Sequence, residues 1–241
     1  MKTIKPNQAL STSKKQQIEQ MFDDIAGKYD FLNRFLSMGI DISWRRKTIN
    51  SLKEVNPRRI LDVATGTADL AIEALRLNPE RVTGVDLSAQ MLEKGREKLK
   101  TKGLQDKISL VKGDSEKLPF SDRSFDAVTV AFGVRNFENL LPGIREMHRV
   151  LRPGGKLAVL EFSKPRSFPF KQVYNFYFSY ILPMLGRMVS KSSNAYTYLP
   201  ESVKHFPEGE AFSAYLQQAG FTNIAVKPLT FGICTLYTGI K

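Results

Sequence analysis

Apolar and polar residues follow two rhythms in the middle of the chain. Between residues 59 and 163, short apolar runs that suit the inside of a parallel sheet alternate with stretches whose apolar residues recur at helical spacing. The predicted strands are 60–63, 81–86, 108–114, 125–132 and 156–162, and the predicted helices are 68–75, 89–102 and 140–151. Ser88 and Gly103 suit the two ends of the helix at 89–102, and 152–155 predicts a tight turn. This order predicts an α/β fold, a doubly wound sheet with helices on both faces.

The segments on either side of this core follow other patterns. Between Lys14 and Leu36 the apolar positions keep helical spacing, and Gly27 is expected to break or bend the helix. A turn at 37–41 and a helix at 42–52 follow. One face of the first helix would pack on the core or close over a ligand. The C-terminal part predicts a helix at 209–219 and strands at 223–227 and 229–238.

Residues 164–207 break the alternation. They contain five prolines, and the aromatic cluster at 173–185 is apolar on nearly every side. This pattern predicts a mostly helical insertion, which is either a lid over an apolar substrate or an ordinary core helix. We therefore predict one domain in four parts. They are an N-terminal helical cap (1–58), a ligand-binding core (59–163), an aromatic lid insertion (164–207) and a C-terminal helix with strands (208–241).

The turn after the first strand is the leading candidate for a ligand site. Residues 64–67 lead from the strand into a helix, so free helix N–H groups face the loop, and Gly66 lets a ligand approach the backbone. The loop has neither the glycines of a dinucleotide fingerprint nor the end of a P-loop. Asp62 and Asp69 would repel a pyrophosphate and suit a ligand with a positive amine or sulfonium.

Further polar side chains follow the next two strands. Asp86 lies 20 positions beyond Gly66, where Rossmann-like proteins bind a pair of ribose hydroxyls. Asp114 and Ser115 follow the third strand and could meet an adenine edge. Acids at three successive strand ends, with no phosphate-binding device, indicate S-adenosylmethionine rather than NAD or ATP. A structural turn with helix-capping acids is the alternative.

Composition narrows the chemistry further. The single Cys234 excludes an internal disulfide and a cysteine metal cluster, and two histidines, His148 and His205, disfavour a histidine metal site, so no metal is expected. No apolar segment of a secretory signal follows Met1, and no stretch approaches the ~20 apolar residues of a membrane span. The sequence therefore predicts a cytoplasmic location.

The net charge of +12 lies mostly outside the predicted core. Residues 1–59 hold 12 basic and 6 acidic side chains, residues 60–162 hold 16 and 15, and residues 163–241 hold 8 and 3. Basic flanks could meet an anionic membrane or nucleic acid, and solvated surface charge is an equally good interpretation. The aromatic cluster lacks interleaved lysine and arginine, which argues against nucleic acid.

Three stretches resemble one family. The sequences YDFLNRFLSMGIDISW (29–44) and RVLRPGGKLAVLEFS (149–163) resemble the two signatures of the ubiquinone/menaquinone biosynthesis C-methyltransferases, and FGVRNF (132–137) resembles a further block. The resemblance implies a seven-stranded class I S-adenosylmethionine-dependent methyltransferase fold (Rossmann-like) and methylation of a ring carbon on a polyprenylated quinol. The cofactor-binding residues that the loop pattern and the resemblance together indicate are Asp62, Gly66, Thr67, Asp86, Asp114 and Ser115.

The chain departs from the family pattern at three positions. The first signature usually has a histidine where Asp41 stands, so no catalytic role of that histidine can be transferred. It often has a methionine where Leu32 stands, and Ala131 replaces a frequent serine and its hydroxyl.

Arg135 and Asn136 are the predicted catalytic pair. Ring-carbon methylation needs an activated hydroquinone, and the guanidinium could stabilise a phenolate while the amide orients a hydroxyl or a water. An arginine that braces its loop is the alternative. His205 and Tyr196 are weaker candidates for a base, and we expect His148 to be structural.

Four functions remain, in decreasing order of support. We expect conversion of demethylmenaquinol to menaquinol, because the DVATGTADL loop and the short N-terminus resemble the family's menaquinone-only members. A ubiquinone-pathway or dual quinol methyltransferase is the closest alternative, followed by a nucleic-acid-directed methyltransferase and, more distantly, an NAD-linked oxidoreductase. The preferred function predicts a polyprenylated quinol and an anionic membrane surface as partners, without nucleic acid. It also predicts peripheral attachment at the inner face of the membrane, and it allows a homodimer.

Overall fold

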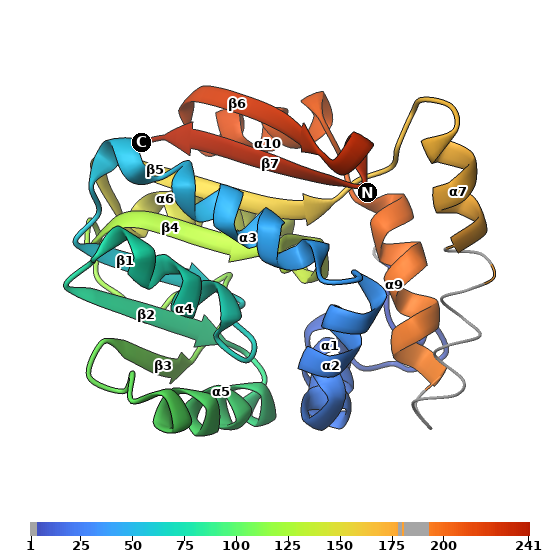
Figure 1. The fold of residues 1–241 in the computed structure, drawn as a ribbon, viewed down its shortest axis with the longest axis horizontal. Coiled ribbons are helices and arrows are strands. Elements are labelled where there is room, and N and C mark those ends of the chain that lie inside the picture. Colours follow the sequence, from blue (N-terminus) through green and yellow to red (C-terminus); the bar gives the residue numbers. More distant parts are fainter. Residues whose placement is uncertain (1–3, 178–179, 181–192) are drawn as a thin grey trace.

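The chain forms a seven-stranded sheet. The structure is a computed structural model that describes residues 4–177, 180 and 193–241. The strands are β1 (Arg59–Val63), β2 (Arg81–Asp86), β3 (Ile108–Lys112), β4 (Phe125–Ala131), β5 (Leu151–Phe162), β6 (Thr222–Leu229) and β7 (Cys234–Ile240). Their order in the sheet is β3-β2-β1-β4-β5-β7-β6, with β1 to β5 parallel and β7 antiparallel to both neighbours (Figure 1). The predicted parallel core is confirmed.

Helices cover both faces of the sheet, as the alternating pattern predicted. One face carries α3 (Ile40–Asn50), α4 (Asp69–Ala74) and α5 (Ala89–Lys102), and the other carries α6 (Leu140–Val150) and α10 (Glu210–Gln218). Strand β1 is buried on both sides, with Ile60 in the first layer and Leu61 in the second. Burial on both faces explains why the central strands are almost continuously apolar.

Local signals fixed several boundaries. The Ser88 side chain caps α5 by accepting a hydrogen bond from the Met91 N–H, and Gly103 ends the helix in a left-handed conformation, as predicted. The first predicted helix divides, as expected near Gly27, into α1 (Lys14–Ile25), a short 3₁₀ turn and α2 (Tyr29–Leu36).

Three predicted boundaries were wrong. Residues 152–155 do not separate α6 from a strand, because β5 already begins at Leu151 and bulges there, pairing Leu151 with Phe125 and Lys156 with Ala127. Helix α3 begins at Ile40, where the left-handed Gly39 allows an earlier start. The strand predicted at 229–238 is interrupted by a 3₁₀ turn at 230–232, which forms the corner between β6 and β7.

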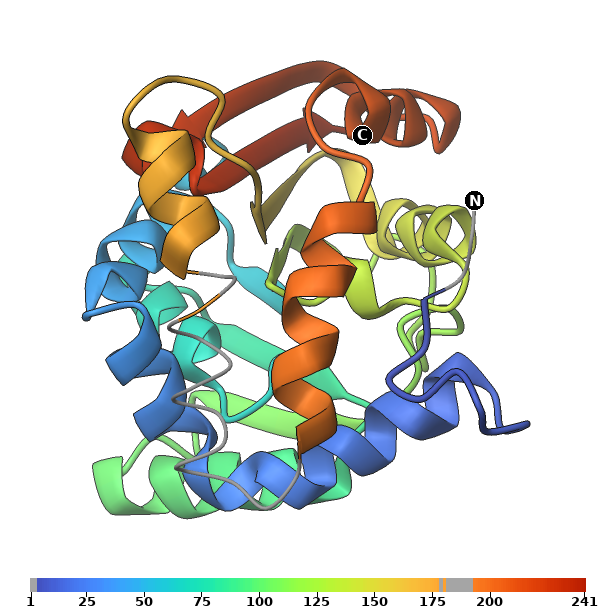
Figure 2. The same cartoon turned by 90° about the vertical axis from the view of Figure 1, so that its right-hand side faces the viewer.

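The remaining helices form a cap at the carboxyl ends of the parallel strands. Figure 2 views this end, where α9 (Ser193–His205) crosses above α1, and α7 (Phe170–Phe176) lies beside the α2–α3 corner. The helical part of the predicted insertion is thus confirmed, whereas most of the aromatic cluster at 173–185 lies outside the described residues. Among the described helices, none has the length and apolar character needed to cross a membrane.

Candidate active site

The loop after β1 is held by a buried carboxylate. Asp62 is 1% exposed and accepts hydrogen bonds from the hydroxyls of Thr65 (2.6 Å) and Thr129 (2.8 Å). Its burial raises the pKa of Asp62 to about 6. Ala64 and Ala68 have positive φ angles of 52° and 69°, which cost on the order of 1–3 kcal/mol each, so the loop needs such anchors.

A second carboxylate joins the loop to the end of β2. Asp86 accepts hydrogen bonds from the backbone N–H groups of Gly66 (2.8 Å) and Ser88 (2.9 Å). Burial raises the pKa of Asp86, and no cation among the described residues pairs with this side chain. Gly66 has a φ of +56°, and a Cβ there would point towards the Tyr29 ring at 3.8 Å. Asp86 therefore presents spare acceptor capacity beside an exposed stretch of backbone.

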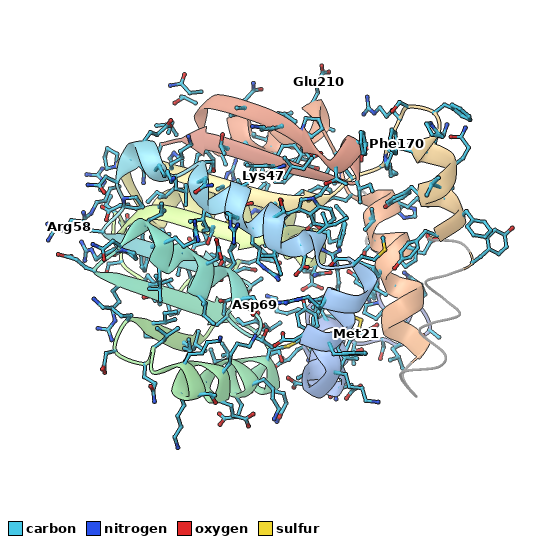
Figure 3. All side chains as sticks on the ribbon, viewed as in Figure 1. Met21, Lys47, Arg58, Asp69, Phe170 and Glu210 are labelled. Atoms are coloured by element: carbon cyan, nitrogen blue, oxygen red, sulfur yellow. The ribbon has the colours of Figure 1, made fainter. Side chains whose placement is uncertain are left out.

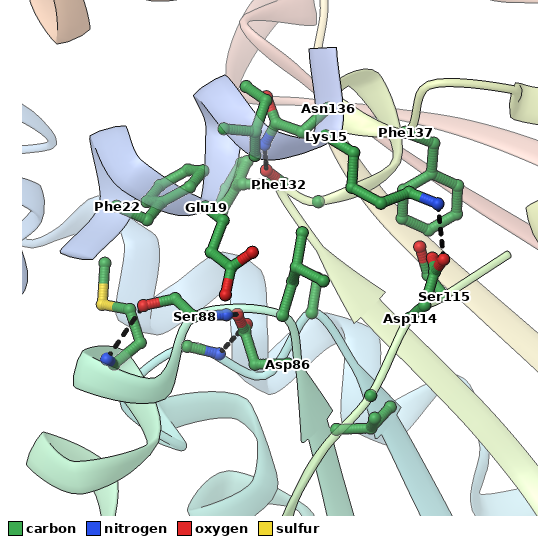
Figure 4. A pocket seen from close by; sticks show the side chains of 18 of the residues that line it. Lys15, Glu19, Phe22, Asp86, Ser88, Asp114, Ser115, Phe132, Asn136 and Phe137 are labelled. Carbon is green, nitrogen blue, oxygen red and sulfur yellow. Dashed lines mark hydrogen bonds and ion pairs between the residues drawn. The ribbon is translucent and has the colours of Figure 1, made fainter. Parts of the chain in front are cut away.

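These groups line a cavity at the strand ends. Gly66, Asp86, Asp114 and Ser115 share its wall with residues of α1, and Figure 4 shows Glu19 and Phe22 above Asp86 and Ser88. Lys15 reaches across from α1 to Asp114, with 2.5 Å between the ammonium and the carboxylate. The cavity thus combines acids with an aromatic wall, which suits a nucleoside with hydroxyl groups and a cationic tail.

Two predicted donor contacts lie elsewhere. Asp62 is beneath the loop and does not line the cavity, and Thr67 is 3% exposed and donates a hydrogen bond to Asp30 at 2.5 Å. Lys98 donates to the Thr67 hydroxyl (3.1 Å) and to Asp69 (2.7 Å), and Figure 3 shows Asp69 between α4 and the N-terminal helices. The side chains of Asp62, Thr67 and Asp69 are therefore held by partners behind the loop, in positions that support it.

A second, larger cavity lies against the first. It lies between the α1–α3 segment, the residues that follow β4, the end of β5, α7 and α9. Its wall is mainly aromatic and aliphatic, with Phe132 stacked on Phe162 at 4.4 Å between ring centroids. The two cavities have four wall residues in common: Phe22, Tyr29, Phe132 and Asn136. An apolar molecule in the second cavity would thus meet a nucleoside in the first across these side chains.

The predicted catalytic pair lies in the 3₁₀ turn η4 (Val134–Asn136), where Asn136 lines both cavities and Arg135 lines the apolar one. Arg135 is largely buried and forms an ion pair with the buried Glu161 at 2.7 Å, so the loop-bracing alternative describes part of its role. Burial raises the pKa of Glu161. The Asn136 amide donates weakly to the Phe132 carbonyl (3.4 Å), while its Oδ1 is buried without a hydrogen-bond partner among the described residues. That oxygen can accept a hydrogen bond from a ligand.

The other candidates are separated from this wall. His205 lines a third cavity on another side of α9, and its Nδ1 lies 2.9 Å from the Glu201 carbonyl. His148 packs edge-on against Phe221, which confirms the structural role expected of it. The side chain of Tyr196 lies outside the described residues. Within the part of the chain that the structure describes, no three His, Cys, Asp or Glu side chains could hold a metal ion.

The sequence did not identify the contribution of α1 and α2 to the nucleoside-sized cavity. Lys15, Glu19, Phe22 and Tyr29 all line it. The amphipathic spacing indicated that one face could close over a ligand, but this spacing is the same for a face that packs on a core.

Comparisons with known proteins agree with this geometry. The sequence matches the ubiE/COQ5 methyltransferase family over residues 10–241. A protein of Bacteroides fragilis named demethylmenaquinone methyltransferase is 52% identical over 95% of this chain and 94% of its own length. A protein of Porphyromonas gingivalis with the same name is 47% identical, with the same two coverages. A solved SAM-dependent methyltransferase of Thermotoga maritima shares the fold, with 19% identity and a TM-score of 0.62 over 93% of this chain and 99% of its own.

The buried Asp62 gives a testable pH dependence. Its folded pKa of about 6 lies above the unfolded value of 3.8, so its contribution to stability is fully present below about pH 3.8 and is lost as the pH rises through 6. The loss amounts to about 3 kcal/mol. In Asp62→Asn this slope should disappear from the free energy of unfolding measured by urea denaturation between pH 4 and 7. The exposed Asp106→Asn should keep the wild-type slope, and an equal slope in Asp62→Asn would contradict the assignment.

Proposed function

The chain belongs to the ubiE/COQ5 methyltransferase family, and from this premise we propose that it methylates a ring carbon of demethylmenaquinol, with S-adenosylmethionine as the donor, to give menaquinol. The main observation that supports this proposal is that two adjacent cavities share the wall residues Phe22, Tyr29, Phe132 and Asn136. One is polar and acidic and the other is apolar, as a nucleoside donor and a prenylated ring require. The names of the relatives from Bacteroides fragilis and Porphyromonas gingivalis support the menaquinone substrate over a ubiquinone precursor.

Four of the predicted residues are proposed to hold the donor. The Asp86 carboxylate would accept hydrogen bonds from the ribose hydroxyls, and Asp114 and Ser115 would meet the adenine edge. Gly66 would allow the donor to lie against the loop backbone. S-adenosylmethionine supplies an electrophilic methyl on a sulfonium. Asp62 and Thr67 would act on the donor only by fixing the loop.

The acceptor is proposed to lie in the apolar cavity. A prenylated naphthalene diol is planar and mostly apolar, and its ring hydroxyls need polar partners when they are buried. Asn136 offers an unpaired oxygen to a ring hydroxyl, and the Arg135 guanidinium would stabilise negative charge that develops on a ring oxygen. The aromatic wall would exclude water and hold the ring close to the donor, which is where much of the catalysis of an in-line methyl transfer arises.

The proposed donor contact has a direct test. In Asp86→Ala, the affinity for S-adenosylmethionine measured by titration calorimetry should fall about tenfold to hundredfold, because two charge-assisted hydrogen bonds are lost. The exposed Asp106→Ala is the control and should bind as the wild type does. Equal affinity in Asp86→Ala would remove the ribose assignment.

The proposed reaction is tested by a transfer assay. Labelled S-adenosylmethionine is incubated with each of two short-chain acceptors, reduced demethylmenaquinone and a reduced demethylated ubiquinone precursor, and the product masses are measured by mass spectrometry. We expect label in the naphthoquinol. Label in both acceptors would make the enzyme dual. No label in either, with the donor still bound, would contradict the proposal and favour the nucleic-acid alternative.

We also propose that the mouth of the apolar cavity docks on an anionic membrane at its inner face. Met38 (81% exposed) and Val173 (63% exposed) line the cavity and also face solvent, so they mark its mouth. Phe168, Phe176 and Phe231 nearby are 79%, 59% and 65% exposed. These five side chains form the docking face, and residues 163–241 add the basic excess that anionic lipid would attract.

The docking face predicts a specific loss of vesicle binding. In the double variant Phe168→Asp and Phe176→Asp, co-sedimentation with vesicles of anionic phospholipid should weaken at least tenfold, because two exposed aromatic side chains that would enter the lipid become charges that the lipid repels. Turnover of a short-chain acceptor in solution should stay normal, since neither residue lines a cavity. Val226→Asp, on β6, is the control. Unchanged, salt-insensitive sedimentation of the double variant would rule out this face.

A further inference from the structure

A buried acid lies in the wall of the apolar cavity. Asp41, in the first turn of α3, is 3% exposed and lines this cavity beside Ser37 and Arg45. Among the described residues of that wall, Asp41 is the one carboxylic acid. Burying a carboxylate in apolar surroundings costs free energy unless it is paired, so its presence here needs an explanation.

The local contacts fix the position of this carboxylate and leave it able to accept more hydrogen bonds. Ser37 donates its hydroxyl to Oδ1 at 2.7 Å, and the Arg45 guanidinium pairs with Oδ2. Arg45 also lies 3.3 Å from Asp69, so one guanidinium serves two carboxylates. Each Asp41 oxygen carries two lone pairs, and one described donor occupies each oxygen. A ligand hydroxyl in the cavity therefore finds free acceptor capacity on a rigidly held group.

The reaction needs a proton acceptor, and the other polar wall residues cannot serve. The wall arginines, Arg45 and Arg135, are always protonated. Asparagine amides and a serine hydroxyl are not bases near neutral pH. Burial raises the pKa of the wall tyrosines, so their phenols stay protonated; these are Tyr29, Tyr174, Tyr177 and Tyr198. Asp41 remains as the described wall residue that can take a proton.

We propose that Asp41 is the general base that binds and deprotonates the ring hydroxyl next to the carbon that is methylated. This inference rests on the proposed function. As the hydroxyl proton moves to the Asp41 carboxylate, the adjacent ring carbon gains nucleophilicity and forms its bond to the methyl group, and the sulfonium S–CH₃ bond breaks. The ring carbon then loses its own proton to water, the oxygen regains a proton from Asp41, and the ring becomes aromatic again. The balance is methylated quinol, S-adenosylhomocysteine and one released proton.

The test compares the turnover of two variants. If Asp41 acts as a base, one order of kcat is expected, and if it acts only as a structural ion-pair partner, the opposite order is expected. Asp41→Asn keeps an oxygen acceptor for Ser37 and Arg45 but cannot take a proton. Asp41→His supplies a base of similar reach but cannot accept the Arg45 pair in the same way. For Asp41→Asn we expect kcat to fall about 100-fold or more with KM changed less than threefold. Asp41→His should recover at least tenfold of that loss.

Donor affinity and a matched control complete the experiment. Both variants should bind S-adenosylmethionine as the wild type does, because Asp41 does not line the donor cavity. Asp24→Asn, exposed on α1, is the matched control and should keep full turnover. If the kcat of Asp41→His is no higher than that of Asp41→Asn, the base assignment is overturned. A higher KM with unchanged kcat in Asp41→Asn would also overturn it, because that result means that Asp41 only binds the hydroxyl. If the wild-type enzyme is inactive on the naphthoquinol, the proposed function and this inference are overturned together. If the wild type is active and Asp41→Asn is equally active, only the inference is overturned.

Discussion

The loop between β1 and α4 exists in its observed form because two buried carboxylates hold it. Two alanines and a glycine with positive φ would relax in a free peptide, and the strain is balanced by the hydrogen bonds of Asp62 from below and Asp86 from the side. Asp62 also binds Thr129, which ties the loop to β4 across the centre of the sheet. The hydrogen bonds of these buried carboxylates therefore keep the loop rigid and leave an open surface at the strand ends, where a ligand can lie against the backbone.

A network of charges couples this loop to the apolar cavity. Arg45 lies between Asp41 in the cavity wall and Asp69 at the start of α4, and Lys98 continues the contacts from Asp69 to Thr67 and Asp30. Because α3 supplies two members and α4, α5 and α2 one each, the relative positions of the two cavities are fixed by several elements at once. A methyl transfer needs such a fixed relation, since misplacing the acceptor carbon by about 1 Å costs up to about 100-fold in rate.

The sequence could predict the donor side of this arrangement much better than the acceptor side. Parallel strands bring their carboxyl ends to one edge, so Gly66, Asp86 and Asp114 could be assembled from spacing alone. Which way a loop side chain points depends on φ values at Ala64 and Ala68, which no pattern of residue types reveals. The sequence did not show that Asp62, in β1, and Thr67 bind hydrogen-bonding partners behind the loop, and their contact with the donor stays a prediction. The boundary at 152–155 failed for another reason: the turn-forming residues there lie in a bulge inside β5, which already begins at Leu151.

The acceptor cavity is harder to predict because its wall comes from segments with no periodic relation to one another. Residues near 21–45, 132–136, 162, 170–177, 198–199 and 233 meet there. An aromatic residue on any of these segments has the same sequence signature as a core residue, and only the fold decides between them. The division has a chemical consequence. The acidic cavity is built largely on short loops of the parallel sheet, whereas the apolar cavity is enclosed mostly by the cap helices, so substitutions in the cap can reshape the apolar wall while the hydrogen bonds of Asp62 and Asp86 stay intact. Asp41 lies on the cap side of that boundary and Asp69 on the donor side, and Arg45 is the side chain through which a change in one would reach the other.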